Sequence, residues 1–437
     1  MRSLNFFLEA SVFLLSFGSV SQTLSQGNLV IVGGGLEANN KSVYLQLISL
    51  AGGAENATFA VIPSASGAPM QSYVYFRDIL ISYGLKPENI NLIPVAMVDD
   101  DSTTNMNESE WKNNGNNSRL AELVRKCSAV WFTGGDQMRT MKMLIRSDGS
   151  NTPVLEAVWE VYHSGGVIGG SSAGAAIMSE VMIGGGTSIA ALSHGIITNY
   201  SGDDFPEGQG VLVTKGLGLF PHGLVDQHFN ARARIGRLVM TLMGNKKEGS
   251  QEFGDKKGGS LGFGIDENTA LIYNSKQDRM IVAGAAGVTI LNTANARIFY
   301  AQNLPVIENI SLSYLEEGDS YDFTTGIVMP AEGKQSTKGK EHHKDHYYSQ
   351  DGILSGYQTS FRDLYSIHLA DNKATDTIQN ISLINNTTGF LITLRKTSLF
   401  EGYCTIAPNE ENHYTVTNIM LDITPVHISV TPMNNKY

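Results

Sequence analysis

Val167-Ile168-Gly169-Gly170-Ser171-Ser172-Ala173-Gly174-Ala175 is the stretch that decides the fold of this chain. An apolar run typical of a buried strand leads into a Gly-x-Ser-x-Gly motif, and the small residues after it are typical of a helix start. Such a sharp turn raises one hydroxyl, here that of Ser172, above a sheet, and only small neighbours fit the crowded backbone. The helix N-terminus adds free N–H groups and a partial positive charge beside that oxygen. The stretch predicts a hydrolase with Ser172 as nucleophile; the alternative is a glycine-rich turn without chemistry.

Short apolar runs alternate with helical stretches around this motif. Strands are predicted at 29–32, 59–62, 90–95 and 129–132, and helices at 69–83, 120–126 and 153–163, with another helix ending at Ile145. A polar stretch at 99–118 is interpreted as a surface loop. The alternation predicts an α/β fold, a three-layer αβα arrangement with a mainly parallel sheet. Sites in such folds form at the carboxyl ends of strands, where Gly33–Gly35, Gly134–Gln137 and Ser172 all fall.

The character of the sequence changes beyond about residue 330. A charged run at 334–346 is followed by β-type alternation at 378–422. We therefore expect a catalytic domain at 22–330 and a β-rich C-terminal extension at 331–437. At the other end, Arg2, an apolar run at 6–20 and the small residues Ser19-Val20-Ser21 predict a signal peptide at 1–21. The apolar run is short for a membrane span, so a secreted, extracellular protein without a membrane anchor is expected.

The amino-acid composition limits the kinds of binding partner to expect. The 437 residues include 31 basic and 42 acidic side chains, for a formal net charge of −11, which argues against nucleic acid and is compatible with a cationic substrate. Cys127 and Cys404 are too few for a disulfide framework, and their pairing is left open. Sequons for N-glycosylation support secretion, and they stand at Asn40, Asn56, Asn107, Asn116, Asn199, Asn309, Asn380, Asn385 and Asn386.

A serine nucleophile needs an oriented imidazole within hydrogen-bond reach. Among the ten histidines, His228 has the most unusual context, because it lies at a predicted strand end and follows Asp226. A helix with Asn230 as its cap is predicted next, and it carries Arg232, Arg234 and Arg237. This crowding of charges at a helix start favours a site; the alternative is a structural histidine beside a solvated basic face.

A third block, Gly262–Leu271, places Asp266 and Glu267 between two apolar strands. A carboxylate at a strand end can fix the tautomer of an imidazole and offset its positive charge. The alternative is a hairpin tip with Asp266 and Asn268 as turn formers. Spacing alone leaves Asp226, Asp266 and Glu267 open as the orienting acid.

The backbone of Gly134-Gly135-Asp136-Gln137 offers N–H groups near a helix start. The N–H of Gly135, together with that of Ala173, suits an oxyanion hole, since donors aimed at developing charge lower the barrier. The Gln137 side chain is a candidate for substrate binding. Each glycine here also fits a plain turn.

Two other patterns carry less weight. Gly33-Gly34-Gly35 resembles a dinucleotide loop, but the Gly-x-Gly-x-x-Gly pattern fails at position 38, which is Ala. The histidines at 342, 343 and 346 lie in a charged run and are interpreted as part of a solvated loop rather than a metal site. No metal and no cofactor are expected.

Taken together, the blocks at 134–137, 170–175, 226–238 and 264–270 resemble the cyanophycinase family of serine peptidases, which are relatives of aspartyl dipeptidase (peptidase E). The resemblance extends from about residue 28 to 291. It implies a class I glutamine-amidotransferase-like fold and hydrolysis of cyanophycin without a cofactor. That polymer has a poly-aspartate backbone with arginine on each side chain, and the product is the β-Asp-Arg dipeptide.

The resemblance also implies roles for residues. Ser172 would be the nucleophile, His228 the base and Glu267 the third member of a triad. The residues implied to line the substrate pocket are Gln137, Asp226, Gln227, Arg234 and Arg237. Carboxylates suit the guanidinium groups of such a substrate, and forked arginine donors suit its free carboxylates.

Some features depart from the compact members of that family. Ser171 stands where the family usually has Thr, and the signal peptide, sequons and extension are similar to the larger secreted members. The expected partner is a peptide or polyamide bearing Asp and Arg, and the protein is a possible homodimer. Two other functions stay open: an inactive extracellular binding or matrix protein on the same fold, and an aspartyl dipeptidase acting on ordinary short peptides.

Overall fold

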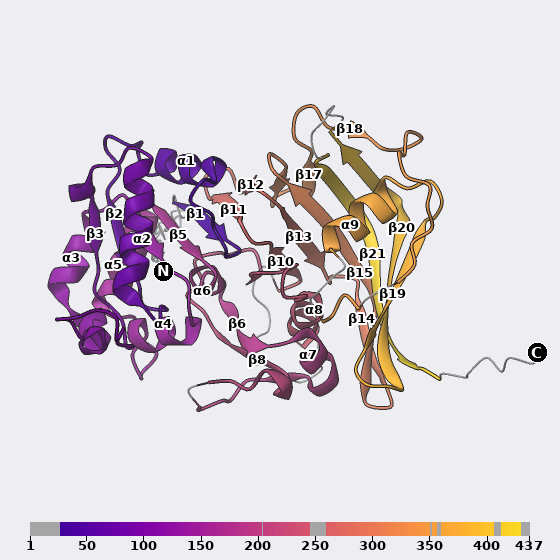
Figure 1. The fold of residues 1–437 in the computed structure, drawn as a ribbon, viewed down its shortest axis with the longest axis horizontal. Coiled ribbons are helices and arrows are strands. Elements are labelled where there is room, and N and C mark those ends of the chain that lie inside the picture. The colour runs from indigo at the N-terminus through magenta and orange to yellow at the C-terminus, as the bar shows by residue number, and fades with distance from the viewer. Residues whose placement is uncertain are drawn as a thin grey trace, which may run out of the picture.

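The computed structural model describes residues 27–202, 204–244, 259–349, 352–355, 360–405 and 412–429. The signal peptide predicted at 1–21 lies outside these ranges. Two large β-sheets stand next to each other, with the N-terminal helices around the first and the C-terminal strands building most of the second (Figure 1). No helix in the described ranges is long and apolar enough to cross a membrane.

The first sheet contains the α/β unit that the sequence predicts. Its strand order is β17-β16-β12-β11-β1-β5-β4-β2-β3. The strands from β1 to β5 are parallel, and β11 extends the sheet antiparallel to β1. The prediction of an α/β fold around a mainly parallel sheet is confirmed for this unit. The bounds are β1 Asn28–Val32, β2 Phe59–Ile62, β3 Ile90–Leu92, β4 Ala129–Phe132, β5 Val167–Ser171, β11 Thr269–Asn274, β12 Arg279–Gly284, β16 Ser320–Asp322 and β17 Ile327–Met329.

Helices cover both faces of this sheet because its central strands are apolar on both sides. Leu29 and Ile31 of β1 share a core with helices α3 and α5, whereas Val30 and Val32 share another with α1 and α2. The polar stretch at 99–118, predicted as a loop, contains a 3₁₀ segment. The bounds are α1 Lys41–Leu50, α2 Pro69–Ser82, α3 Ser118–Arg125, α4 Gln137–Leu144, α5 Pro153–His163, α6 Ala173–Ala176, η1 Pro87–Asn89 and η2 Glu108–Asn116.

The second sheet crosses the boundary predicted at residue 330. Its order is β18-β20-β21-β15-β13-β10-β9, with β14 on β15 and β19 on β20. Strands on both sides of that boundary are therefore hydrogen-bonded in one sheet, and the β-rich character expected beyond it is confirmed. The bounds are β9 Leu224–Asp226, β10 Leu261–Ile265, β13 Gly287–Asn292, β14 Arg297–Ala301, β15 Leu304–Glu316, β18 Gln335–Ser336, β19 Thr377–Leu383, β20 Thr388–Cys404 and β21 Tyr414–His427.

The remaining elements lie between the two sheets or on the second one (Figure 1). A small sheet has the order β6-β8-β7, and α8 packs into the same core as the inner strands of the second sheet. The bounds are β6 Val181–Gly186, β7 Ile196–Ile197, β8 Val211–Lys215, α7 Ser188–His194, η3 Glu207–Gln209, α8 Ile235–Gly244, α9 Phe361–Tyr365 and the π-helical turn η4 Ser366–Ala370. Cys127 and Cys404 are both free, buried thiols.

Two of the sequons have their amide nitrogen engaged in the folded chain. Asn380 is 3% exposed, and its Nδ2 donates to Tyr347 Oη at 2.9 Å. Asn40 Nδ2 donates to the backbone oxygen of Asn268 at 2.8 Å. A glycan at either nitrogen would break these hydrogen bonds. Glycosylation stays a prediction, and the other sequons are better candidates for it.

Ending the chain after residue 330 is expected to abolish folding. The truncation removes β21, which pairs with Ile310 and Leu312 of β15, both fully buried. Exposing each such side chain costs about 1.5–3 kcal/mol, against a total stability of about 5–15 kcal/mol for a typical domain. Soluble yield and a cooperative urea transition measure the effect. A chain that ends after residue 429 is the control and should behave as the full chain, whereas a stable, cooperative 27–330 fragment would contradict this expectation.

Candidate active site

Ser172 stands at the sharp turn between β5 and α6. Its backbone has φ 56° and ψ −110°, a strained conformation that costs about 1–3 kcal/mol and clusters at functional sites. Its N–H donates to the oxygen of Val32 at 3.0 Å, which ties the turn to the end of β1. A Cβ at Gly170 would lie 2.5 Å from the carbonyl oxygen of Gly174, so only glycine fits. This is the strand-turn-helix geometry of the predicted nucleophile elbow.

His228 reaches this serine from the second sheet. It follows the end of β9, and its backbone is left-handed, with φ 47°. Its N–H donates to the oxygen of Gly33 at 2.6 Å, which holds the His228 loop against the end of β1. The imidazole Nε2 lies 2.8 Å from Ser172 Oγ, and the side chain is 9% exposed. Nucleophile and base are thus within hydrogen-bond reach.

Gly34 forms the surface on which this imidazole lies. A Cβ at Gly34 would stand 2.2 Å from His228 Cε1, and the residue has φ +104°. A Cβ at neighbouring Gly35 would be 3.3 Å from that of Glu267. The three glycines match the Gly-x-Gly-x-x-Gly pattern of a dinucleotide loop only poorly. The feature of the sequence that pointed to a site was their position at the carboxyl end of the first predicted strand.

Glu267 completes a chain of hydrogen bonds through the imidazole. Its Oε1 lies 2.5 Å from His228 Nδ1, and its side chain is 44% exposed. The following residue, Asn268, has φ 53°, and its N–H donates to the oxygen of Gly34 at 2.8 Å. Asn40 Nδ2 in turn donates to Asn268 Oδ1 at 2.8 Å. Of the three acids that spacing left open, the structure brings Glu267 to the histidine.

The other two acids have different partners. Asp226 is 1% exposed, and its Oδ2 accepts from Arg237 Nε at 2.8 Å. Arg237 also donates to the oxygen of Gly186 at 2.8 Å. Asp266 accepts from the N–H of Asn230 at 2.9 Å, and burial raises its pKa to about 7. Both acids hold loops of the site from beneath and do not contact the imidazole.

The residues implied to bind substrate are mostly buried. Gln137 is 8% exposed, and its Nε2 donates to the oxygens of Ile183 and Gly184 at 2.9 and 3.0 Å, which braces β6. Arg234 Nη1 donates to the oxygen of Gln227 at 2.6 Å. Gln227 is 4% exposed, and its Oε1 has no hydrogen-bond partner among the described residues. Substrate contacts stay a prediction for all of them, and Gln227 has the uncommitted acceptor.

The predicted oxyanion donors lie at the edge of the elbow. A Cβ at Gly134 would be 3.9 Å from Ser172 Oγ, which places the loop after β4 beside the nucleophile. Gly135 has φ +137°, and a Cβ there would be 2.0 Å from the oxygen of Ala65. The N–H of Ala173 opens α6. N–H donors at this edge would suit an oxygen that gains negative charge.

Electrostatics keep the imidazole neutral. Burial lowers the pKa of His228, and the positive charges of Arg232 and Arg234 lower it further, while the hydrogen bond that the ring donates to Glu267 raises it. With the Nδ1 proton directed at Glu267, the Nε2 lone pair faces Ser172 Oγ; this tautomer is assigned from the hydrogen-bond geometry. A neutral ring in this orientation can accept the serine proton.

The loop after His228 differs from the sequence prediction. A helix capped by Asn230 was expected, but α8 begins only at Ile235, because Ala233 has φ 49° and interrupts the helix. Asn230 instead contacts the extension: its Oδ1 accepts from the N–H of Phe361 at 2.8 Å. The rings of Phe229 and Phe361 also meet edge to face, with centroids 5.5 Å apart. Helix α9 thus braces the loop that carries His228.

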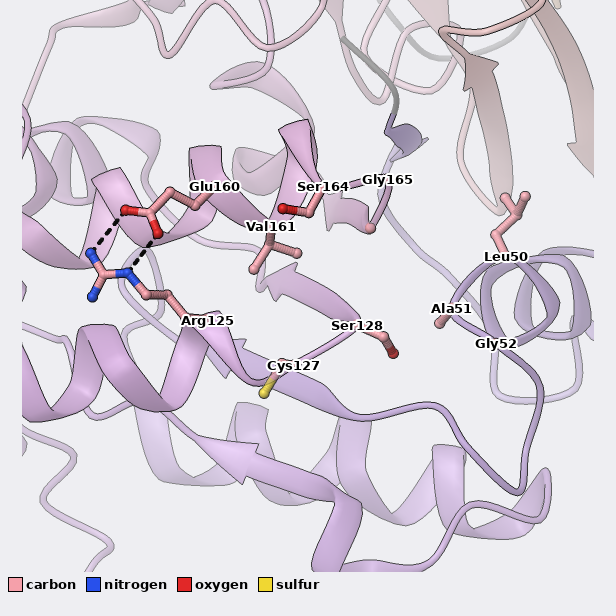
Figure 2. A pocket seen from close by; sticks show the side chains of 11 residues that line it. Leu50, Ala51, Gly52, Arg125, Cys127, Ser128, Glu160, Val161, Ser164 and Gly165 are labelled. Carbon is pink, nitrogen blue, oxygen red and sulfur yellow. Dashed lines mark hydrogen bonds and ion pairs between the residues drawn. The ribbon is translucent and has the colours of Figure 1, made fainter.

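A pocket of about 350 Å³ lies elsewhere (Figure 2). It is bordered by Ser128 and Gly166, which precede β4 and β5, so it lies at the amino ends of strands whose carboxyl ends carry the site. The ion pair between Arg125 and Glu160, with Nε–Oε2 at 2.7 Å, spans one of its walls. This pocket is therefore separate from the Ser172 site.

Comparison with known proteins identifies the family and relatives of this chain. The pattern of Peptidase family S51 matches residues 29–281. A cyanophycinase of Geminocystis herdmanii is 30% identical over 316 residues, which cover 71% of this chain and 98% of that protein. A cyanophycinase of Synechococcus elongatus is 28% identical over 328 residues, covering 72% and 87%.

A solved structure, that of a peptidase from an acI-B1 Actinobacterium, is 22% identical with a TM-score of 0.45, and covers 69% of this chain and 98% of that one. The family resemblance expected from the four sequence blocks is confirmed by the match to the family pattern and by the curated relatives. Because the family pattern spans more than half of the residues, this chain belongs to Peptidase family S51.

Proposed function

We propose that this protein is a serine peptidase in which Ser172 attacks the substrate carbonyl. The observation that carries the proposal is the continuous chain from Ser172 Oγ through His228 to Glu267, with separations of 2.8 and 2.5 Å. A strained elbow, a buried neutral imidazole and an orienting carboxylate are the parts that nucleophilic acyl transfer requires.

The reaction proceeds in two halves. His228 Nε2 accepts the proton of Ser172 as Oγ bonds to the carbonyl carbon, and the N–H groups of Gly135 and Ala173 stabilise the oxyanion. The imidazolium, held by Glu267, then protonates the leaving amine, and an acyl-enzyme forms. Water attacks that ester with His228 again as base, which releases the acid product and restores the serine.

The proposed substrate is a cyanophycin-like or β-aspartyl peptide that bears Asp and Arg. Two relatives, matched over 98% and 87% of their length, are named cyanophycinase, and the formal net charge of this chain is −11. The uncommitted Oε1 of Gln227 is a candidate acceptor for a substrate N–H. We also propose an extracellular place of action, on the basis of the apolar N-terminal run and the sequons.

Ser172→Ala is expected to lower kcat on cyanophycin by roughly 10⁴-fold or more, because no other group supplies the nucleophile. Release of β-Asp-Arg and of free amino acids from isoaspartyl dipeptides measures the activity. Ser171→Ala, which removes the neighbouring hydroxyl, is the control and should retain activity within about tenfold. Turnover of the dipeptides alone would favour an aspartyl dipeptidase. No turnover and no labelling by a serine-directed phosphonate would leave only an inactive binding protein.

The pH dependence follows from His228. Its pKa is lowered from 6.5, so the ring stays neutral to a lower pH than a free imidazole. The acid limb of kcat/KM should therefore have its midpoint below 6.5. Glu267→Gln removes an interaction that raises this pKa, so the limb should move lower still while kcat falls by roughly 10²–10⁴-fold. Glu37→Gln, which changes an exposed carboxylate nearby, should alter neither the acid limb nor kcat. An acid limb that does not move in Glu267→Gln would contradict the role assigned to Glu267.

Gly34→Ala is expected to push the imidazole away from Ser172. The new Cβ would stand 2.2 Å from His228, and a displacement of about 1 Å can cost roughly 10²-fold in kcat. Gly53→Ala is a matched control, because Gly53 also has positive φ, +82°, but nothing within 4 Å of the added atom. Both variants should lose thermal stability, Gly34→Ala the more because of its clash with the buried ring, and kcat should fall only in Gly34→Ala. Equal loss of activity would mean that backbone strain, not the ring contact, matters.

A further inference from the structure

Three side chains from distant parts of the extension converge at one point. His342 lies after β18, Asp371 follows the turn η4, and Cys404 is the last residue of β20. The Nδ1 of His342, a carboxylate oxygen of Asp371 and the Sγ of Cys404 all lie within 4.8 Å of one another. None of these residues contributes to the Ser172 site, and the charged run at 334–346 had been interpreted as a solvated loop.

The cluster is held in place by hydrogen bonds. His342 Nδ1 lies 3.1 and 3.0 Å from the two oxygens of Asp371, and the N–H of His342 donates to Oδ1 at 2.8 Å. Tyr414 Oη donates to Oδ2 at 3.1 Å. The backbone of His343 is bonded to both sides of this turn, donating to Asp371 and accepting from Lys373 at 2.9 and 3.1 Å. These bonds orient the carboxylate as the outer partners of a metal ligand do.

A fourth ligand is within reach. His343 Nε2 lies 3.8 Å from Asp371 Oδ2, and its side chain is 41% exposed. Tetrahedral sites with bonds of about 2.0–2.3 Å place their ligand atoms about 3.5 Å apart. A tetrahedral site would require the two half-exposed imidazoles to turn toward Asp371 and Cys404, which are buried.

The charge of Asp371 is the second argument. Its side chain is 0% exposed, and its ion-pair partners in the described chain are the two histidines, with no lysine or arginine among them. Three other buried carboxylates each have a permanent cation: Asp226 has Arg237, Asp319 has Lys334 and Glu316 has Arg362. Two more, Asp266 and Glu108, have no ion-pair partner among the described residues and accept hydrogen bonds instead. A buried carboxylate without such a partner is costly. A bound cation would supply the missing charge.

We propose that His342, His343, Asp371 and Cys404 form a structural site for a borderline-soft divalent cation of the zinc class. Imidazole nitrogen and thiolate sulfur are the ligands that Zn²⁺ prefers, whereas Mg²⁺ and Ca²⁺ take oxygen ligands. On binding, the Cys404 thiol releases its proton to solvent and its sulfur bonds to the metal. Four protein ligands leave no open position, so the site clamps the extension and takes no part in peptide cleavage.

The clamp would join three segments that otherwise meet by hydrogen bonds: the loop at 342–343, the turn after η4 and the end of β20. The α9–η4 segment also carries Phe361, which bonds to Asn230 beside the His228 loop. Metal binding should therefore raise the melting temperature of the whole chain, and the rise should grow with free metal concentration.

Co²⁺ and Zn²⁺ are the probes for the experiment, with the full-length protein produced without a histidine tag and freed of metal by a chelator. We expect one Co²⁺ per chain with a thiolate-to-cobalt charge-transfer band, displaced by Zn²⁺. Cys404→Ala should lose the band, and Cys127→Ala, which removes the other buried thiol, should retain it. His342→Ala should weaken Zn²⁺ binding at least tenfold in equilibrium dialysis, whereas His346→Ala, in the same segment, should not.

Several results would overturn the site. The wild-type chain taking up no metal, or binding that is unchanged in both His342→Ala and Cys404→Ala, contradicts it. Should Cys404→Ala fail to fold, His342→Ala decides, because that side chain is 45% exposed and lies outside the hydrophobic core. Activity on peptides is not needed as a readout, so the outcome is independent of the proposed catalysis.

Discussion

The contact between the His228 imidazole and the bare backbone of Gly34 is the constraint on which the site depends. The nucleophile and the base come from different sheets, β5 in the first and β9 in the second. They meet because the end of β1 accepts a hydrogen bond from the His228 backbone at 2.6 Å and presents no Cβ to its ring. Any side chain at position 34 would separate the two sheets at the point where the chemistry requires them to touch.

Three more residues where the two sheets meet have left-handed backbone conformations. Ser172, His228 and Asn268 all have φ between 47° and 56°, and each follows the end of a strand or its first loop residues. Such residues store strain that the surrounding hydrogen bonds must hold. Here those bonds all run to the end of β1, from Ser172 to Val32, from His228 to Gly33 and from Asn268 to Gly34. The three loops are therefore held by the same short segment.

Local patterns in the sequence predicted the α/β unit and the elbow well. Buried strands such as 29–32 and 129–132 are short apolar runs, and the glycines around Ser172 are required by backbone contacts within the motif itself. The resemblance, rather than spacing, singled out Glu267 among three acids, because the sequence does not show that β9 and β10 are parallel neighbours with adjacent ends. The prediction that a helix starts at Asn230 was wrong for a similar reason, because the hydrogen-bond partners of Asn230, which are Asp266 and Phe361, are distant in sequence. The resemblance implies that Asp226 and Arg237 line the substrate pocket, which stays a prediction; in the structure a buried ion pair joins them.

The contact between Asn230 and Phe361 has a consequence for biosynthesis. The two residues are 131 positions apart, and β21, which completes the sheet beside them, comes later still. A nascent chain on the ribosome thus contains all three residues of the Ser172–His228–Glu267 chain long before the brace for the histidine loop is translated. Until Phe361 is translated, the loop that carries His228 lacks this brace.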